Sequence, residues 1–354
     1  MRFYFIFLLV LFVSCQEEEE ETITPLLPNA YGDGMYIVTD FGIHYLDYKD
    51  SAALVQTQIF NSVNSSNLIN PKNISFIDGK GFILSDRLSI VDINTFNLEN
   101  EITGFSNPVF CNKISFNRLL VADKGSSTVR VVDLDLFDIV SNIETGDSTK
   151  PAFIMSTYTK AYVLNGGRVP AMFKDSTMIA IEHKDQLVPT SIILDVVNLG
   201  DNPSSGMIQG DLLILCRGVF NPLNPLSNTE SSLYKVFPNN LNVFYSRDLT
   251  SIYNADNLIY NYYNNRYYFT ADGGIYGMSE DGTGITQIIT SESDVLVRNE
   301  EKYNNTDTTQ VYANMFYIND INNPSNIYKY NMSLSQFVDT IVVPGKVVDI
   351  KFKD

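Results

Sequence analysis

The sequence predicts an all-β fold, and three observations support this expectation. Almost the whole chain alternates short runs of Val, Ile, Leu, Tyr and Phe with clusters of Gly, Asn, Asp, Ser and Pro. No long stretch shows the 3.6-residue hydrophobic period of an amphipathic helix. The aromatic content is high, with 21 Tyr and 22 Phe, and aromatic side chains favour strands.

The first residues predict export and lipid attachment. Arg2 precedes an apolar run, residues 3–13, which is too short to span a bilayer but suits a secretory signal peptide. The run ends in a small residue followed by Cys15, which resembles a bacterial lipobox. We expect residues 1–14 to be the signal peptide and Cys15 to carry the lipid anchor, with palmitate among its acyl chains. Residues 15–31 are an acidic tether that like-charge repulsion keeps solvated.

Composition limits the partners and the redox chemistry. A net charge of −17 disfavours nucleic acid and anionic lipid headgroups, so the N-terminal lipid is the only expected membrane contact. Cys111 and Cys216 fall in different repeats, where buried free thiols are favoured over the alternative of one disulfide. No motif for a cofactor or a metal ion is present in the sequence.

A repeated unit of short strands is clearest in residues 119–146. There, three strands are separated by a polar loop at residues 124–128 and by a turn after Asp133. Residues 82–104 and 35–60 follow the same order. Units of roughly 35 to 52 residues with four strands each are typical of β-propeller blades.

Each unit opens with a further short strand, and proline often precedes or begins it. Proline suits this position because its missing N–H is not yet needed by the strand ladder. Four units carry it, at Pro71, Pro108, Pro151 and Pro203. The last two units lack it and begin near Asn254 and Asp294.

The two ends of the chain determine the expected number of blades. The first unit lacks its opening strand, while residues 344–352 form a strand that belongs to no unit. A C-terminal strand that joins the N-terminal blade closes the ring and leaves no unpaired edge between the first and last blades. The sequence therefore predicts that residues 32–354 form a seven-bladed β-propeller with four-stranded antiparallel blades.

One unit carries a recognisable motif. Residues 121–133, VADKGSSTVRVVD, resemble the YVTN repeat of YncE-like propellers, and the segments around Asp40 and Asp86 match more loosely. With its acidic stretch behind a lipidated cysteine, the chain is similar to Bacteroidetes-type surface lipoproteins, and distantly to those that capture cobalamin. The resemblance implies an outer-membrane protein that faces the cell exterior. It also implies a nutrient such as a corrinoid as ligand, beside a TonB-dependent transporter.

The expected binding face is formed by the loops that follow the second strand and precede the first strand of each blade. The second strands end at Asp40, Asp86, Asp123, Asn165, Arg217, Asp272 and Asp320. The aspartates, with Asp40, Asp86, Asp272 and Asp320 as candidate site residues, are interpreted either as a cation or polyhydroxyl site or as caps of their own turns.

Insertions in two blades place cationic and apolar residues on the same face. Arg168 lies in the fourth unit, and Arg217 and Phe220 lie in the fifth. With Arg87 and Lys124 they are candidates for a mixed basic and apolar rim that recognises a ligand or partner. The alternative is ordinary surface loops in which each Arg pairs with a neighbouring Asp.

Enzyme motifs are weak in this sequence. Only His44 and His183 are present, and the repeat geometry does not suggest a metal site or a Ser/His/Asp triad. We therefore expect no enzymatic activity and a role in binding a ligand or partner protein on the loop face. The alternatives are a scaffold or adhesion module that binds protein or glycan, and a propeller hydrolase or lyase that uses carboxylates in the funnel.

Overall fold

The computed structural model describes residues 31–146, 149–166, 174–185, 189–221, 223–291, 295–299 and 314–353. Residues Tyr31–Asp354 form one compact unit. The predicted signal peptide, Cys15 and the tether up to residue 30 lie outside the described residues. In the described part of the chain, no helix is both long enough and apolar enough to cross a membrane.

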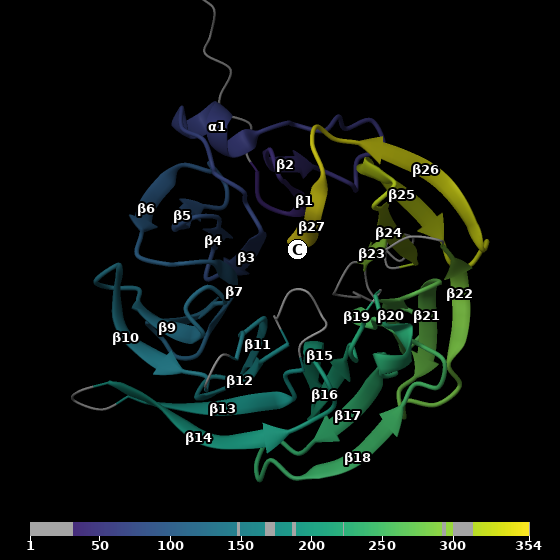
Figure 1. Ribbon diagram of the computed structural model, residues 1–354. Helices are drawn as coiled ribbons and strands as arrows, with labels where there is room; N and C mark the ends of the chain where they lie inside the picture. Colours follow the sequence, from purple (N-terminus) through teal and green to yellow (C-terminus); the bar gives the residue numbers. More distant parts are fainter. Residues whose placement is uncertain are drawn as a thin grey trace, which may run out of the picture. The chain divides into compact units, whose positions relative to one another are not determined.

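The strands form seven antiparallel sheets arranged around a centre, which confirms the predicted seven-bladed β-propeller (Figure 1). Blade 1 consists of β27 (Val347–Lys353), β1 (Gly34–Thr39) and β2 (Gly42–Leu46). Blade 2 consists of β3 (Asn73–Ile77), β4 (Lys80–Leu84), β5 (Leu88–Asp92) and β6 (Leu98–Ile102). Blade 3 consists of β7 (Pro108–Lys113), β8 (Arg118–Asp123), β9 (Thr128–Asp133) and β10 (Asp138–Glu144).

The remaining four blades repeat this order. Blade 4 consists of β11 (Phe153–Ser156), β12 (Lys160–Leu164), β13 (Thr177–Lys184) and β14 (Thr190–Asn198). Blade 5 consists of β15 (Pro203–Gln209), β16 (Asp211–Cys216), β17 (Ser232–Val236) and β18 (Val243–Asp248), with a short 3-10 turn at Pro225–Ser227. Blade 6 consists of β19 (Asp256–Asn261), β20 (Arg266–Ala271), β21 (Gly274–Ser279) and β22 (Thr286–Thr290). Blade 7 consists of β23 (Val295–Arg298), β24 (Met315–Asp320), β25 (Asn323–Asn331) and β26 (Gln336–Val342).

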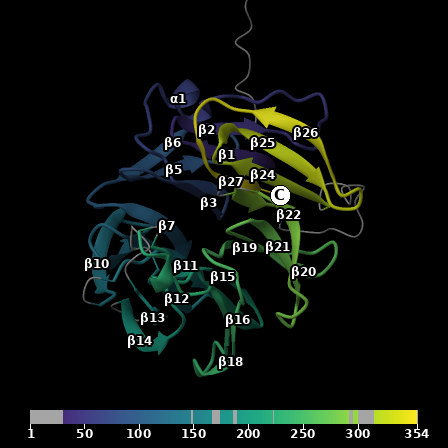
Figure 2. The same cartoon turned by 45° about the vertical axis from the view of Figure 1, so that its right-hand side comes forward.

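The C-terminal strand closes the ring as predicted. β27 pairs antiparallel with β1, from Gly34 opposite Lys353 to Thr39 opposite Val347. The two strands lie side by side in both views (Figures 1 and 2). The innermost strand of blade 1 therefore comes from the opposite end of the chain from its two neighbours.

Blade 1 differs from the others at its outer edge. The expected outer strand is reduced to one bridge between Tyr45 and Gln56, after which helix α1 (Ile59–Asn64) begins. Gln58 has a left-handed backbone, with φ of 51°, and this breaks the extended run before a longer strand can form. Ile59 and Phe60 on the helix are buried between blades 1 and 2.

Local sequence explains the tight connections. In blade 2, Asp78 and Gly79 link β3 to β4, and both have positive φ, of 50° and 76°. A two-residue Asp-Gly link with this backbone matches the twist of an antiparallel hairpin.

The hydrophobic core is divided among the contacts between blades. Seven clusters of buried side chains are present in the described residues, and each spans two neighbouring blades. The cluster at the closure joins Tyr317 and Ile327 of blade 7 to Ile37 and Ile350 of blade 1. Cys111 and Cys216 are buried in two different clusters as free thiols, as predicted.

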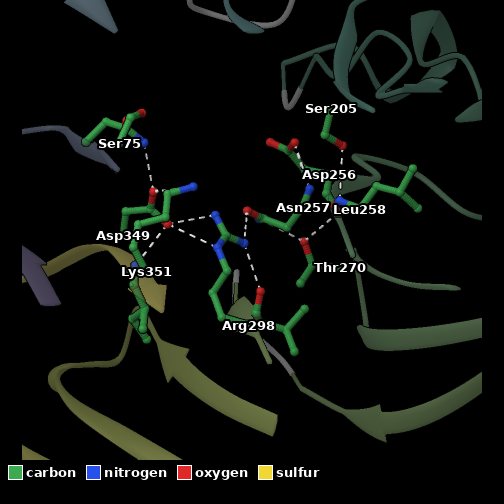
Figure 3. Close-up of polar contacts among 12 residues, drawn as sticks. Ser75, Ser205, Asp256, Asn257, Leu258, Thr270, Arg298, Asp349 and Lys351 are labelled. Atoms are coloured by element: carbon green, nitrogen blue, oxygen red, sulfur yellow. Dashed lines mark hydrogen bonds and ion pairs between the residues drawn. The ribbon is translucent and has the colours of Figure 1, made fainter. Parts of the chain in front are cut away.

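A buried polar network reinforces the same closure (Figure 3). Arg298 of β23 donates to Asp349 of β27 through Nε and Nη2, at 3.1 and 2.8 Å, and to Asn257 of β19 at 2.9 Å. The other Asp349 oxygen accepts from Asn73 of β3 at 3.0 Å. Asp349 is only 5% exposed, so its charge is held by these partners and not by water. Four consecutive blades, 6, 7, 1 and 2, are thus tied together.

We predict that Arg298→Met destabilises the protein by about 3 to 5 kcal/mol, because it removes the cation that donates two hydrogen bonds to the buried Asp349 carboxylate. Urea unfolding measures the change. The double variant Arg298→Met/Asp349→Leu removes both charges and is expected to regain much of the loss. Lys80→Ala is the control, since the Lys80–Glu99 pair is solvent-exposed and contributes at most about 1 kcal/mol. Equal stability of Arg298→Met and wild type would contradict the proposed role of the network.

His44 is buried in blade 1 as a neutral ring. Its Nδ1 accepts from the Gln58 backbone N–H at 3.3 Å, so the proton resides on Nε2, which lies 2.9 Å from Thr39 Oγ1. Burial lowers the pKa of His44 from 6.5 to about 4. Protonation therefore takes place more readily in the unfolded chain than in the folded one.

We predict that His44 makes the protein less stable as the pH falls. Between pH 6.5 and about 4 the unfolded chain binds a proton at His44 that the folded chain does not. The stabilisation associated with the neutral ring is therefore fully present above pH 6.5 and is lost on acidification. The free energy of unfolding of wild type relative to His44→Gln should fall by about 3 kcal/mol across this window. Chemical denaturation at several pH values checks this, and parallel pH profiles for the two proteins would show that His44 does not titrate in this way.

Candidate functional site

The centre of the ring holds a cavity of about 770 Å³. Its lining includes residues of the innermost strand of every blade, namely β27, β3, β7, β11, β15, β19 and β23. The loops that lead into these strands open on the same face as the loops that follow the second strands. This is the face on which the sequence analysis expected a site.

Four cations gather at this face, and we call them the basic cluster: Lys72, Lys124, Lys150 and Arg217. They come from four consecutive blades, 2 to 5. Lys72 lines the cavity, and Arg217 forms an ion pair with Asp256, which lines it as well. The basic cluster therefore touches the cavity through Lys72 and, by way of Asp256, through Arg217, whereas Lys124 and Lys150 are not among the lining residues.

The loops of blade 3 contact three of these cations, Lys72, Lys124 and Lys150. Lys72 Nζ donates to the Asn107 side chain and, at 3.1 Å, to the Pro108 carbonyl. The Lys124 backbone N–H donates to the Asn107 carbonyl at 3.0 Å. From the other side, Lys150 Nζ donates to Ser127 Oγ at 3.1 Å. Cations from blades 2 and 4 thus lie on both sides of the loop that carries Lys124.

The basic cluster carries an excess of positive charge. Burial, followed by the charges of Arg217, Lys72 and Lys150, lowers the pKa of Lys124. Burial also lowers the pKa of Lys72, although the Asp123 and Asp86 carboxylates oppose this. Within the described residues, neither Lys124 nor Lys150 forms an ion pair. A ligand that carries negative charge would offset this repulsion.

The Lys124 loop is itself fixed by the preceding aspartate. Asp123 is fully buried and accepts from the backbone N–H groups of Ser106 and Asn107, with Asn107 at 2.6 Å. It also accepts from Arg130 Nε at 3.0 Å. Gly125 in the Lys124 loop lies against Ser106 and Asn107, and a Cβ at this position would be 2.8 Å from Ser106 Cβ, so any larger residue would push the two segments apart.

The predicted aspartates accept hydrogen bonds within their own blades. Asp40 accepts from the Lys346 backbone N–H at 2.7 Å, and Asp272 accepts from Asn254 Nδ2 at 2.9 Å, so both cap the loop that leads into their own blade. Asp320 caps its own turn through Asn322 N–H at 2.8 Å, and Asp86 lies beside Ser85 and Arg87. In the described residues, no group of three or more His, Cys, Asp or Glu side chains is placed to hold a metal ion.

The structure brings together only part of the predicted basic and apolar rim. Lys124 and Arg217 belong to the basic cluster. Arg87 does not, because its Nε donates to Glu101 on the outermost strand of blade 2 at 2.7 Å. Phe220 is half-buried in the loop after β16, and Arg168 lies outside the described residues.

Sequence reasoning missed the cations on the loops that lead into the inner strands. Lys72 and Lys150 were absent from the candidates, as was Lys346, which is exposed and lines the cavity. A pattern in the sequence marks all three, since each lies within two residues of the proline that leads into an inner strand.

The structure also corrects the expectation that no Ser/His/Asp arrangement exists. His183 Nδ1 lies 2.7 Å from Ser191 Oγ, and its Nε2 lies 3.1 Å from Asp185 Oδ1. Burial lowers the pKa of His183, against the effect of Asp185, so the neutral ring is favoured. The three residues meet because Ser191 pairs with His183 across β13 and β14. None of them lines the central cavity.

Comparisons with known proteins give the fold. No family model matches the chain, and no curated protein matches its sequence. A solved quinoprotein alcohol dehydrogenase-like protein from Bacteroides thetaiotaomicron is 16% identical, with a TM-score of 0.63 over 91% of this chain and 79% of that chain. The periplasmic gluconolactonase of Pseudomonas aeruginosa is 10% identical, with a TM-score of 0.65 over 91% and 99%. A streptogramin B lyase is 11% identical, with a TM-score of 0.54 over 78% and 84%.

These neighbours overturn the expectation that the protein has no enzymatic activity. A gluconolactonase and a lyase are enzymes, and both share the propeller architecture. The fold therefore does not argue against catalysis. At identities of 10% and 11%, the likeness shows the fold alone and does not establish an activity.

We predict that Asp123→Ala destabilises the protein by about 2 to 4 kcal/mol, because two backbone N–H groups and Arg130 lose a buried acceptor. Asp86→Ala is the matched control from the neighbouring blade. Its carboxylate is 44% exposed, so the expected change is at most about 1 kcal/mol. Thermal or urea unfolding compares the two. Similar small losses in both variants would mean that the Lys124 loop does not depend on Asp123.

Proposed function

We propose that this protein binds an anionic ligand at the basic cluster, beside the central cavity. The observation that carries the proposal is the gathering of Lys72, Lys124, Lys150 and Arg217 from four consecutive blades. The same chain has a net charge of −17. A local positive site on an acidic protein attracts and selects negative ligands, whereas other parts of the surface repel them.

Repulsion among the cations of the basic cluster costs free energy, and an anionic ligand would offset it. Like charges brought together while partly removed from water repel each other more strongly than on an open surface. Asp256 offsets Arg217, but no described carboxylate pairs with Lys124 or Lys150. These two lysines belong to the same cluster as Lys72, which lines a cavity of about 770 Å³, and lysine ammonium groups suit the charged group of a small anionic molecule.

We predict that Lys124→Ala weakens binding of inorganic phosphate about tenfold, which corresponds to the loss of one charge-assisted contact. Isothermal titration at low salt measures the affinity, because screening weakens it at high salt. Since the pKa of Lys124 is lowered, phosphate affinity should also fall at a lower pH than it would beside an ordinary lysine.

Lys80→Ala is the control, since Lys80 pairs with Glu99 at the end of blade 2 that lies away from the basic cluster. It should bind phosphate as wild type does. Absence of phosphate binding in wild type, or equal affinity in Lys124→Ala, would overturn the proposal.

We further propose that the protein is an exported outer-membrane lipoprotein, anchored through Cys15 and facing the cell exterior. The apolar run before Cys15 and the five glutamates behind it support this. In this setting the propeller captures a nutrient and passes it to a TonB-dependent transporter. Affinity purification from gently solubilised outer membrane tests the partnership, and recovery of the propeller alone would argue against it.

We predict that Cys15→Ala abolishes incorporation of labelled palmitate and releases the protein from the membrane fraction. Loss of the thiol removes the only site for the lipid in this reading of residues 1–15. Fractionation followed by immunoblotting measures the distribution, with Cys111→Ala as a control that keeps the anchor. A Cys15→Ala protein that remains equally membrane-bound would show that the lipoprotein proposal is wrong.

A further inference from the structure

The lining of the central cavity is mixed, and two groups of side chains stand out in it. On the side of blades 3 to 5 is an apolar group, which we call the apolar wall: Phe110, Phe153, Met207 and Ile208. On the side of blades 6, 7 and 1 is a polar network, which we call the polar wall: Asn257, Arg298, Asp349 and Lys351 (Figure 3).

The apolar wall holds an aromatic pair. The rings of Phe110 on β7 and Phe153 on β11 lie with centroids 4.4 Å apart, and both side chains are only partly buried. Lys351 Nζ lies 5.8 Å from the Phe110 centroid, at cation–π range. Phenyl rings that face a cavity remain in contact with water, so an apolar group that covers them gains free energy.

The two cations of the polar wall share one carboxylate. Arg298 donates to one oxygen of Asp349, and the second oxygen accepts from Asn73 and lies 3.5 Å from Lys351 Nζ. Lys124 and Lys150 of the basic cluster have no carboxylate partner among the described residues. We therefore place the ligand's anionic group at the basic cluster.

Strand β7 links Lys72 of the basic cluster to Phe110 of the apolar wall. Lys72 Nζ donates to the carbonyl of Pro108, the first residue of β7, and Phe110 is the third residue of that strand. Lys72 and Phe110 both line the cavity, so a cation of the basic cluster and an aromatic surface face the same space.

We infer that the ligand is a small aromatic carboxylate, whose anionic group is held by the basic cluster and whose ring covers Phe110 and Phe153. The inference rests on the proposed function and adds the chemical class of the ligand. The cavity volume of about 770 Å³ lies within the range typical of small-molecule sites. Charge alone would admit any anion, whereas the aromatic wall selects those that carry an aromatic group.

The test uses three probes with the purified propeller. 2-Naphthoate has ring and charge, 2-naphthamide has the ring without the charge, and inorganic phosphate has charge without the ring. Isothermal titration should show 2-naphthoate bound at least tenfold more tightly than either of the others. Phe153→Leu should weaken 2-naphthoate about tenfold and leave phosphate unchanged, while Lys124→Ala should weaken both anions.

Phe337→Leu is the matched control, because Phe337 is an exposed aromatic residue on the outermost strand of blade 7 and should leave all three affinities unchanged. Thermal unfolding confirms that each variant is folded. If phosphate binds through Lys124 but 2-naphthoate binds no tighter, or Phe153→Leu has no effect, the ligand class is wrong and anion binding stands. If neither anion binds, the ligand class and the proposed function both fail.

Discussion

Closure of the ring by β27 is the constraint on which the rest of this structure depends. Each blade buries its apolar side chains against its two neighbours, so an open ring would leave two blades with an exposed face. Pairing of β27 with β1 removes that edge by hydrogen bonds, and the Arg298–Asp349 pair adds a buried link between blades 7 and 1. Because all inner strands line one cavity, the closure also determines the shape of the candidate site.

The loop face carries a cluster of positive charge, whereas the chain as a whole is negative. A net charge of −17 makes four neighbouring cations an exception that needs a physical reason. Asp123 anchors the loop that carries Lys124 but is itself matched by Arg130, so it leaves the lysine's charge unbalanced. Several aspartates that the sequence placed on this face serve as caps, and the charge that distinguishes the site is positive.

The structural neighbours share an architecture that supports enzymes, and this limits what the fold says about function. Repeated blades leave the loops free to vary while the hydrogen-bonded sheets stay the same. Function in such a scaffold is therefore argued from particular side chains. In this chain those are the basic cluster and the aromatic wall of the cavity, with Ser191, His183 and Asp185 as a separate arrangement on the outer strands of blade 4.

The strand pattern, the prolines before the inner strands and the orphan C-terminal segment by themselves determined the number of blades and the closure of the ring. These features are local or periodic, and hydrogen bonding between strands leaves few ways to satisfy them. The site was only half predictable, since Lys124 and Arg217 were identified but Lys72, Lys150 and the Phe110–Phe153 pair were not. Only the tertiary structure decided which cations meet, that Arg87 turns to Glu101 and that Ser191 reaches His183. Side-chain direction depends on partners in neighbouring strands and blades, and a one-dimensional pattern does not contain those distances.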